Sequence, residues 1–456
     1  MDFKNFRNTR EIILEILIRI EEKNAYLNIL INYYLKNYNV KNIDKGFIHE
    51  ICYGVTRFRK SLDWIIGQFL VNNRKKLPST ILNILRMGVY QIVYLDKVPD
   101  YAIVNESVQL AKKGRFSGYS NLVNAILRNI IRKYDNIYWP DINQDPVKYI
   151  SVFYSYPDWM IKRWLKRYGM ELCKTVCNQM NTKPNITLRI NKLRINMVEL
   201  KNKLDVNFRE AEYLNNESII VSDFFDVANS EMFKSGLFSV QDESSTLASR
   251  LLNPLPDQTI IDMCSGPGGK TTHMAQLMNN KGNIIAFEKN PRRLEMVMKE
   301  CKRLGIDIVK PILNDATILR KNYLGKADKI LVDVPCSGTG VIRKKPDLKW
   351  KILNDDSLKK LNKIQKAILN TASGYLKPGG ELVYSTCSLE KEENDIIIRN
   401  FLKNNNHFIV KDTTAFVNDF KVVKFNTEID NSIQLLPGYS GSSIDGFYMV
   451  KLQKNK

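Results

Sequence analysis

Histidine and paired cysteine are scarce in this sequence, and their scarcity excludes several kinds of site. The 456 residues include three histidines and seven scattered cysteines, and no two cysteines form a CxxC pair. A zinc ribbon requires such pairs, and a disulfide framework requires an even, closely spaced set. We therefore expect no metal site and no disulfide scaffold, and cysteines that stay reduced as they do in the cytoplasm.

Long apolar runs are also missing. No uninterrupted apolar stretch approaches the roughly 18 residues that a membrane span needs. The first apolar stretch, IILEILIRI, is broken by charged residues and has no small-residue cleavage site after it, so a signal peptide is not expected. The sequence predicts a cytoplasmic protein without a membrane partner, and we expect a monomer.

Basic residues, in contrast, are in excess. The chain has 69 Lys and Arg against 48 Asp and Glu, a net charge of +21, and residues 1–140 alone hold 22 basic and 12 acidic residues. Solubility does not need this excess, whereas polyanion binding uses it. A biased base composition is the alternative explanation, because the chain is rich in Lys, Asn and Ile. The charge favours nucleic acid as a partner.

Hydrophobic periodicity divides the chain into three regions. Residues 1–140 carry apolar residues at helical spacing. Residues 141–240 give mixed signals, including the strand-like ITLRI at 186–190. Residues 241–456 alternate apolar runs such as DKILVD with helical segments, which predicts a parallel sheet with crossover helices. The expected fold class is multidomain: an all-α N-terminal domain, a small α/β connector and a C-terminal α/β domain of Rossmann-like type.

A glycine-rich turn follows the first strand of the third region. Such a turn lets the backbone approach a ligand, and the next helix offers free N–H groups. Acidic residues follow later strands, and the carboxyl edge of an open α/β sheet is where ligands bind. The pattern predicts a nucleotide-type site formed by Cys264, Ser265, Gly266, Pro267, Gly268, Gly269, Lys270, Glu288, Asp315 and Asp333.

A P-loop is the first alternative for this turn. The motif needs glycine six residues before its lysine, and that position holds Cys264. The missing glycine and the bulk of Pro267 make an NTPase the less favoured hypothesis. A glycine-rich turn with only a structural role is the second alternative.

Two cysteines follow strands of the same sheet. Cys336 lies in DVPCSGTG and Cys387 in YSTCSLEKEEN. A cysteine on a strand usually fills a core, but Cys387 has polar neighbours and Cys336 lies in a loop. A reactive cysteine must ionise, and a thiol with an ordinary pKa of ~8.5 is only a few per cent thiolate at neutral pH. The basic run at 343–345 could lower that pKa.

One reaction accounts for a thiolate beside a nucleotide-type site in a basic protein. Carbon 5 of cytosine is too weak a nucleophile to take a methyl group directly. Addition of a thiolate to carbon 6 makes carbon 5 enamine-like, so that it can attack a sulfonium methyl. The carbon-5 proton then leaves and the thiol is eliminated.

The motifs of the third region resemble, in order, those of the RNA 5-methylcytosine methyltransferase family. The segments that carry the resemblance are DMCSGPGGKT, Glu288, Asp315, DVPCSGTG, YSTCSLEKEEN and DGFYMV (445–450). The N-terminal segments GFIHEICYGVTRF, ILRMGVYQIVYLDKVPDYAIVNE and SNLVNAILRNI are similar to an antitermination-factor (NusB-like) RNA-binding domain. The combination is similar to bacterial enzymes that methylate a cytosine of small-subunit (16S) ribosomal RNA.

The resemblance implies a role for each motif. S-adenosyl-L-methionine is the implied co-substrate, held by residues 264–270, Glu288, Asp315 and Asp333. Cys387 is the implied nucleophile, and Cys336 assists product release. The implied domains are 1–140 (NusB-like, RNA-binding), 141–240 (connector, RNA-binding) and 241–456 (catalytic). Another structured RNA such as tRNA, or a non-catalytic RNA-binding role, are the alternatives.

The chain departs from the family pattern at a few positions. Ser265-Gly266 stands where two alanines are usual, Glu288 stands where aspartate is commoner, and Val334 replaces alanine. These departures raise two questions: whether Gly266 loosens the loop, and whether the longer Glu288 still reaches a ribose.

A basic segment after the Cys336 loop is a candidate for RNA contact. In RKKPDLKW (343–350), Arg343, Lys344 and Lys345 could meet phosphates and Trp350 could stack on a base. A solvated basic loop is the alternative.

Overall fold

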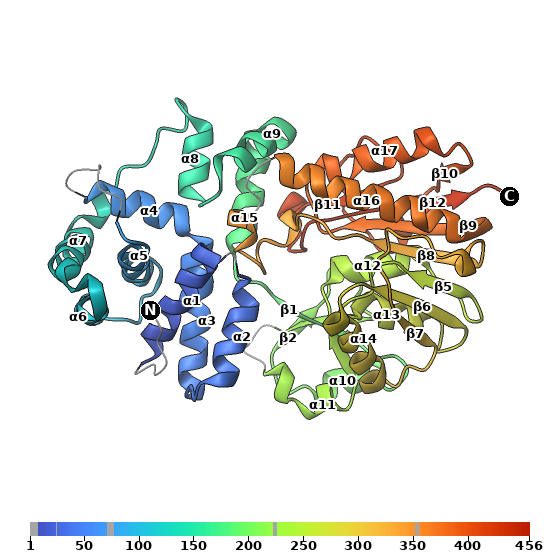
Figure 1. Cartoon of the computed structure of the whole chain (residues 1–456), viewed down its shortest axis with the longest axis horizontal. Coiled ribbons are helices and arrows are strands. Elements are labelled where there is room, and N and C mark those ends of the chain that lie inside the picture. Colours follow the sequence, from blue (N-terminus) through green and yellow to red (C-terminus); the bar gives the residue numbers. More distant parts are fainter. Residues whose placement is uncertain (1–7, 24, 71–76, 222–225, 352–354) are drawn as a thin grey trace. The chain divides into compact units, whose positions relative to one another are not determined.

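The chain folds into two compact units (Figure 1). The computed structural model describes residues 8–23, 25–70, 77–221, 226–351 and 355–456. The first unit comprises Met1–Asn181 and Lys344–Lys351, and the second comprises Thr182–Arg343 and Ile352–Lys456. Within the described residues, no helix combines the length and the apolar character that crossing a membrane requires.

The first unit is helical, as its periodicity predicts. In the first helix, the apolar residues Ile12, Ile13, Ile16 and Leu17 are buried in the core of this unit. Ile20, on the same helix, packs against that core while partly exposed. The helices are α1 (Thr9–Lys23), α2 (Leu27–Asn37), α3 (Asn42–Arg57), α4 (Arg59–Gln68), α5 (Ser79–Tyr94), α6 (Asp100–Lys112), α7 (Ser120–Lys133), α8 (Pro146–Phe153) and α9 (Asp158–Asn181).

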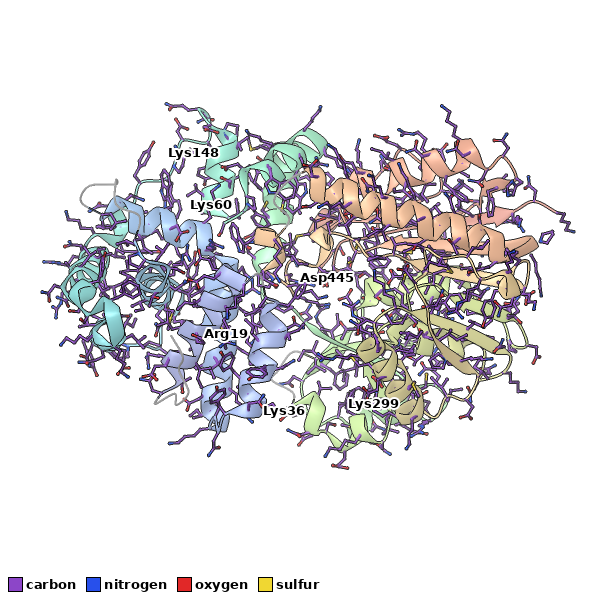
Figure 2. The ribbon with its side chains drawn as sticks, viewed as in Figure 1. Arg19, Lys36, Lys60, Lys148, Lys299 and Asp445 are labelled. Atoms are coloured by element: carbon purple, nitrogen blue, oxygen red, sulfur yellow. The ribbon has the colours of Figure 1, made fainter. Side chains whose placement is uncertain are left out.

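Helices α8 and α9 belong to this first unit. Residues 137–145 have no helix or strand, but the chain then packs back on α4. Ser61 Oγ donates a hydrogen bond to Val152 O at 2.6 Å. Lys60, which is labelled in Figure 2, pairs through its Nζ with Asp158 Oδ1 at 2.6 Å. The compact unit thus extends to Asn181, beyond the residue-140 boundary expected from the sequence.

A short segment from late in the chain completes the first unit. It contains α15 (Leu348–Lys351), and its Lys349 is fully buried. Lys349 Nζ donates to Arg57 O (3.1 Å), Ser155 O (3.0 Å) and Asn181 Oδ1 (2.8 Å). Burial, with the charge of Arg57, holds the pKa of Lys349 well below its ordinary value. Lys349 thus anchors this segment through hydrogen bonds to three neutral oxygens, and none of these partners is a carboxylate.

The second unit begins with a small antiparallel sheet of strand order β2-β3-β1-β4. Strand β1 coincides with the predicted ITLRI strand. The strands are β1 (Ile186–Ile190), β2 (Phe208–Glu210), β3 (Ser218–Val221) and β4 (Phe238–Val240), and the helices are α10 (Met197–Lys203) and α11 (Glu231–Lys234).

The larger sheet has the order β10-β12-β9-β8-β5-β6-β7, with β11 paired to β12. Strands β5 to β9 pair in parallel and β10 to β12 pair antiparallel, so the predicted parallel sheet is confirmed. The strands are β5 (Thr259–Asp262), β6 (Asn283–Glu288), β7 (Val309–Leu313), β8 (Ala327–Asp333), β9 (Leu376–Thr386), β10 (Phe408–Val410), β11 (Ile433–Leu435) and β12 (Phe447–Lys454). The helices are α12 (Glu243–Leu252), α13 (Gly269–Leu277), α14 (Pro291–Leu304), α16 (Asp355–Tyr375), α17 (Asp395–Asn404) and α18 (Thr414–Asp419).

The parallel strands end at one edge of the sheet. Their last residues are Asp262, Glu288, Leu313, Asp333 and Thr386. Because parallel strands share a direction, the polar groups at and beyond these ends converge on that edge, where ligands bind in such sheets.

Lys349→Ala is expected to destabilise the first unit. The substitution leaves three buried oxygens without their donor, at a cost on the order of 3 kcal/mol. Urea unfolding of the full chain measures the change, with the exposed Lys36→Ala on α2 as control. Equal stability of the two variants would show that Lys349 anchors nothing.

Candidate active site

The two predicted cysteines lie side by side. Cys336 follows β8 and Cys387 follows β9, and these strands pair in parallel with Asp333 opposite Ser385. The Sγ atoms of the two cysteines are 3.2 Å apart. Both side chains are partly exposed, and all seven cysteines of the chain are thiols rather than disulfides. Two nucleophile-type groups from segments 51 residues apart thus share one site.

A third motif closes the backbone around them. Gly340 N donates to Cys387 O at 2.9 Å, and Gly446 N donates to Gly340 O at 2.9 Å. A Cβ on Gly340 would lie 2.1 Å from Gly446 O, so only glycine permits this approach of two main chains. The glycines of GTG and DGF therefore fix the cysteine loops against the start of β12.

Cys336 is held in its protonated form. A hydrogen bond with Cys387, desolvation by the surrounding protein and the nearby charges of Cys387, Glu393 and Asp333 raise its pKa well above the ordinary value. The expectation that the basic run lowers this pKa is wrong. Arg343 of that run is buried and pairs with Asp445, Nη2 to Oδ1 at 2.8 Å.

Lys270 lies close enough to Cys387 for their charges to interact. Its Nζ contacts Asp333 Oδ2 at 2.8 Å, and Ser385 Oγ donates to the other oxygen of Asp333 at 2.8 Å. Burial lowers the pKa of Lys270, but the charge and hydrogen bond of Asp333 and the charge of Cys387 raise it above its ordinary value. The interaction is reciprocal, so the Lys270 ammonium favours the Cys387 thiolate.

The glycine-rich turn is tied to the end of β6. Gly266 N donates to Glu288 Oε2 at 3.2 Å, and Asn290 N donates to Glu288 Oε1 at 2.8 Å. A Cβ on Gly266 would lie 2.4 Å from Glu288 Oε2. The two departures from the family pattern therefore compensate each other: the longer acid occupies space that an alanine would fill.

Asp262, at the end of β5, begins the segment DMCSGPGGKT but is not among the residues predicted to form the site. It is buried, and it accepts hydrogen bonds from Thr271 Oγ1 at 2.7 Å and Cys264 N at 3.3 Å. Burial raises its pKa to about 6. Through these two hydrogen bonds, Asp262 joins the glycine-rich turn to the first turn of α13. Its position at a strand end, shared with Glu288 and Asp333, is the signal that could have identified it.

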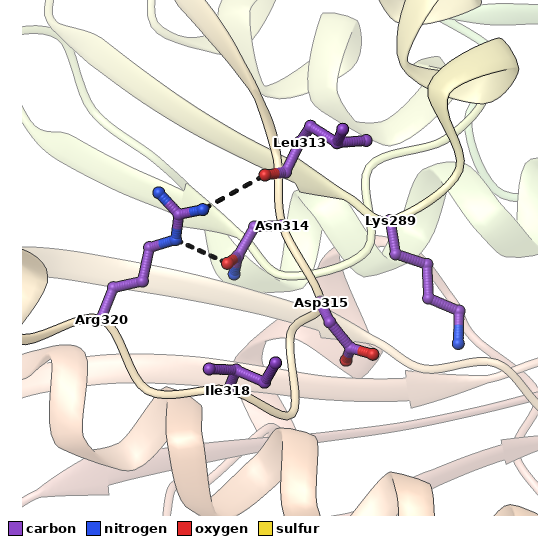
Figure 3. A pocket seen from close by; sticks show the side chains of 6 residues that line it. All are labelled: Lys289, Leu313, Asn314, Asp315, Ile318 and Arg320. Carbon is purple, nitrogen blue, oxygen red and sulfur yellow. Dashed lines mark hydrogen bonds between the residues drawn. The ribbon is translucent and has the colours of Figure 1, made fainter.

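An open pocket lies beyond the ends of β6 and β7 (Figure 3). Asp315 Oδ1 accepts from the N–H and hydroxyl of Thr317, and these bonds lower the Asp315 pKa. Asn314 N donates to Glu288 O at 3.0 Å, so the pocket adjoins Glu288. Its lining residues are Lys289, Leu313, Asn314, Asp315, Ile318 and Arg320. Among the residues with described positions, no cluster of His, Cys, Asp and Glu could hold a metal ion.

The residues of the candidate RNA-contact segment differ in how far they are buried and in what they contact. Trp350 donates its indole N–H to Thr56 O at 2.7 Å, and Arg59 lies 5.5 Å from its ring centroid. These contacts engage both the N–H and the ring of Trp350. Lys345 is exposed, and Lys344 is partly exposed. The two lysines are therefore the members of this run best placed for phosphates.

Comparison with known proteins identifies the family. Three family models match in chain order: the NusB family at residues 7–132, a ferredoxin-like domain of RsmF/B-like methyltransferases at 156–228, and "16S rRNA methyltransferase RsmB/F" at 249–453. The chain is 34% identical to "Probable ribosomal RNA small subunit methyltransferase B" of Bacillus subtilis, over 98% of this chain and 99% of that protein. The chain belongs to this methyltransferase family.

Other relatives agree with this assignment. "Ribosomal RNA small subunit methyltransferase B" of Escherichia coli O6:K15:H31 is 30% identical over 99% of this chain and 100% of that protein. The crystal structure of PH0851 is 26% identical and covers 99% of this chain and 100% of its own, with a TM-score of 0.80. A methyltransferase homologue from Pyrococcus horikoshii is 28% identical, with a TM-score of 0.58 over 68% of this chain and 99% of its own. The predicted NusB-like domain and Rossmann-like methyltransferase fold are confirmed.

Lys270→Met is expected to slow alkylation of Cys387 by iodoacetamide at neutral pH. Loss of the neighbouring cation reduces the thiolate population by about tenfold, a typical effect of one close opposite charge. Mass spectrometry of the Cys387 peptide measures the rate, and Lys299→Met, at an exposed position of α14, is the control. Equal rates in the two variants would remove Lys270 from the site.

Proposed function

We propose that this protein methylates carbon 5 of a cytosine in small-subunit (16S) ribosomal RNA, with S-adenosyl-L-methionine as methyl donor. The observation that carries the proposal is the pair of thiols, with sulfurs 3.2 Å apart, at the carboxyl edge of a methyltransferase sheet. Lys270 beside Cys387 supports the choice of nucleophile. The family membership supports ribosomal RNA as the substrate class.

The residues at the sheet edge fit S-adenosyl-L-methionine, which supplies a sulfonium methyl group when bound. Helix α13 begins at Gly269 within the turn 264–270, and a helix N-terminus offers N–H groups to a ligand; Glu288 is a carboxylate of the kind that binds ribose hydroxyls. Asp315 lies in the adjoining pocket, and Asp333 links the turn to the cysteines through Lys270. These residues are the proposed cofactor-binding set.

The two thiols have different proposed roles. Cys387, as thiolate, adds to carbon 6 of the cytosine and so activates carbon 5. After methylation the carbon-5 proton leaves to a base, and the bond between carbon 6 and the Cys387 sulfur breaks. Cys336, whose raised pKa keeps its proton in place, donates a hydrogen bond to the departing sulfur and assists product release.

The remaining regions are proposed to hold the RNA. Residues 1–140 bind RNA, residues 141–240 form the connector and residues 241–456 carry out catalysis. Lys344 and Lys345 contact phosphates of the RNA. Arg343 and Trp350 would act on RNA only by exchanging their present protein contacts. We propose that the protein acts as a monomer in the cytoplasm. Methylation of a transfer RNA instead of 16S RNA would favour the alternative substrate.

Separate substitutions of the two cysteines are expected to stop the reaction at different points. Cys387→Ala cannot add to carbon 6 and should give neither methylated RNA nor a covalent complex. Cys336→Ala keeps the nucleophile but releases product slowly, and should accumulate a protein–RNA adduct that survives boiling in detergent. Gel shift measures the adduct, and the double variant is the control. An adduct in Cys387→Ala would reverse the two roles.

Glu288→Ala is expected to weaken binding of S-adenosylhomocysteine by roughly 1–3 kcal/mol, the range for a lost charge-assisted hydrogen bond. Gly266→Ala should also weaken it, because of the clash with Glu288. Adding Glu288→Asp to Gly266→Ala should restore part of the affinity; Arg293 Cβ, 2.8 Å from the new Cβ, must still shift. Calorimetry measures the binding. Unchanged affinity in Glu288→Ala would exclude that residue.

A further inference from the structure

Glu393 is a buried acid next to the cysteine pair to which the proposed mechanism gives no role. It ends the short 3-10 helix Lys391–Glu393, between β9 and α17, and its side chain is fully buried. Within the described part of the chain, no lysine, arginine or histidine forms an ion pair with it. Burying a carboxylate without a cation is costly unless hydrogen bonds compensate.

Four neutral donors provide that compensation. Glu393 Oε1 accepts from Ser337 N and from Gln365 Nε2, each at 2.9 Å. Glu393 Oε2 accepts from the hydroxyls of Ser337 and Ser388. An ionised carboxylate suits this set because it accepts at both oxygens.

Three of the four donors belong to the two cysteine loops. Ser337 directly follows Cys336, and Ser388 directly follows Cys387. Gln365, from α16, also donates to Pro335 O at 3.0 Å, the residue before Cys336. One side chain therefore binds the residue after each cysteine and shares a partner with the residue before one of them.

We propose that Glu393 is a positioning residue that holds the Cys336 and Cys387 sulfurs at their working distance by clamping the two loops together. The effect of Glu393 on catalysis rests on the proposed function. The clamp, which is the set of hydrogen bonds from Ser337, Ser388 and Gln365 to Glu393, does not depend on it. The negative charge of Glu393 adds a second effect. That charge favours the protonated thiol of Cys336, whereas the ammonium of Lys270 favours the thiolate of Cys387.

The clamp can be tested without RNA. Phenylarsine oxide condenses with two adjacent thiols to form two As–S bonds and releases water, so its affinity reports on the distance between the sulfurs. Glu393→Ala should bind it about tenfold more weakly, the loss expected for one charge-assisted hydrogen bond. Glu393→Gln should bind nearly as the wild type, because an amide can accept at Oε1 and donate to the two hydroxyls.

Matched variants isolate this effect. Glu295→Ala removes an exposed acid of α14 and should change nothing, while Cys336→Ala and Cys387→Ala define the signal of a single thiol. Wild-type affinity in Glu393→Ala would overturn the proposal, and so would an equal loss in Glu393→Gln and Glu393→Ala. If Glu393→Ala does not fold, Ser337→Ala and Ser388→Ala each remove one hydroxyl of the clamp and should each show a smaller loss; no loss in either would overturn it.

The consequence for catalysis is measured in the Cys336→Ala background with 16S ribosomal RNA transcribed in vitro. Adding Glu393→Ala should lower the maximal rate of adduct formation and leave the half-saturating RNA concentration unchanged. Adding Glu393→Gln should restore the rate. Absence of adduct in Cys336→Ala alone would count against the proposed function. An adduct that forms equally fast with and without Glu393 would count against the positioning role only.

Discussion

The parallel pairing of β8 with β9 is the constraint on which the rest of the site depends. Because Asp333 lies opposite Ser385, both strands leave the sheet at the same level. Within a few residues of its end, each strand is followed by a cysteine. A change of register by one residue would turn alternate side chains to the opposite face. The contacts of Lys270 with Asp333, of Gly340 with Cys387 and of Glu393 with both loops all presuppose this alignment.

The site also gives two chemically identical groups, the thiols of Cys336 and Cys387, different electrostatic surroundings. Lys270 lies where it stabilises negative charge on one sulfur, while desolvation, Asp333 and Glu393 oppose such charge on the other. The sulfurs, 3.2 Å apart, are within hydrogen-bonding distance of each other, so a charge that acts on one thiol also affects the other.

Much of the fold and of the candidate site could be predicted, because it depends on residues that are close together in the sequence. Alternating apolar runs predicted the parallel sheet, and positions at or just after strand ends predicted Glu288, Asp333 and both cysteines as candidate site residues. What could not be predicted depends on contacts between distant segments. The burial of Lys349 in the first unit and the partners of Glu393 follow from tertiary packing, which leaves no periodic pattern. Lys270 was recognised in the turn, but its proximity to Cys387 required the sheet order.

The fit between Gly266 and Glu288 has an evolutionary consequence. With a Cβ on Gly266 only 2.4 Å from the acid, a lineage that carries the longer side chain cannot first acquire alanine in the turn without a clash. Shortening the acid first removes the clash with Glu288 and leaves only the approach of Arg293 Cβ to be relieved, so substitutions at these two positions can proceed more easily in one order than in the other. The pair should therefore vary jointly among descendants, and a glycine in the turn should mark those that have kept glutamate.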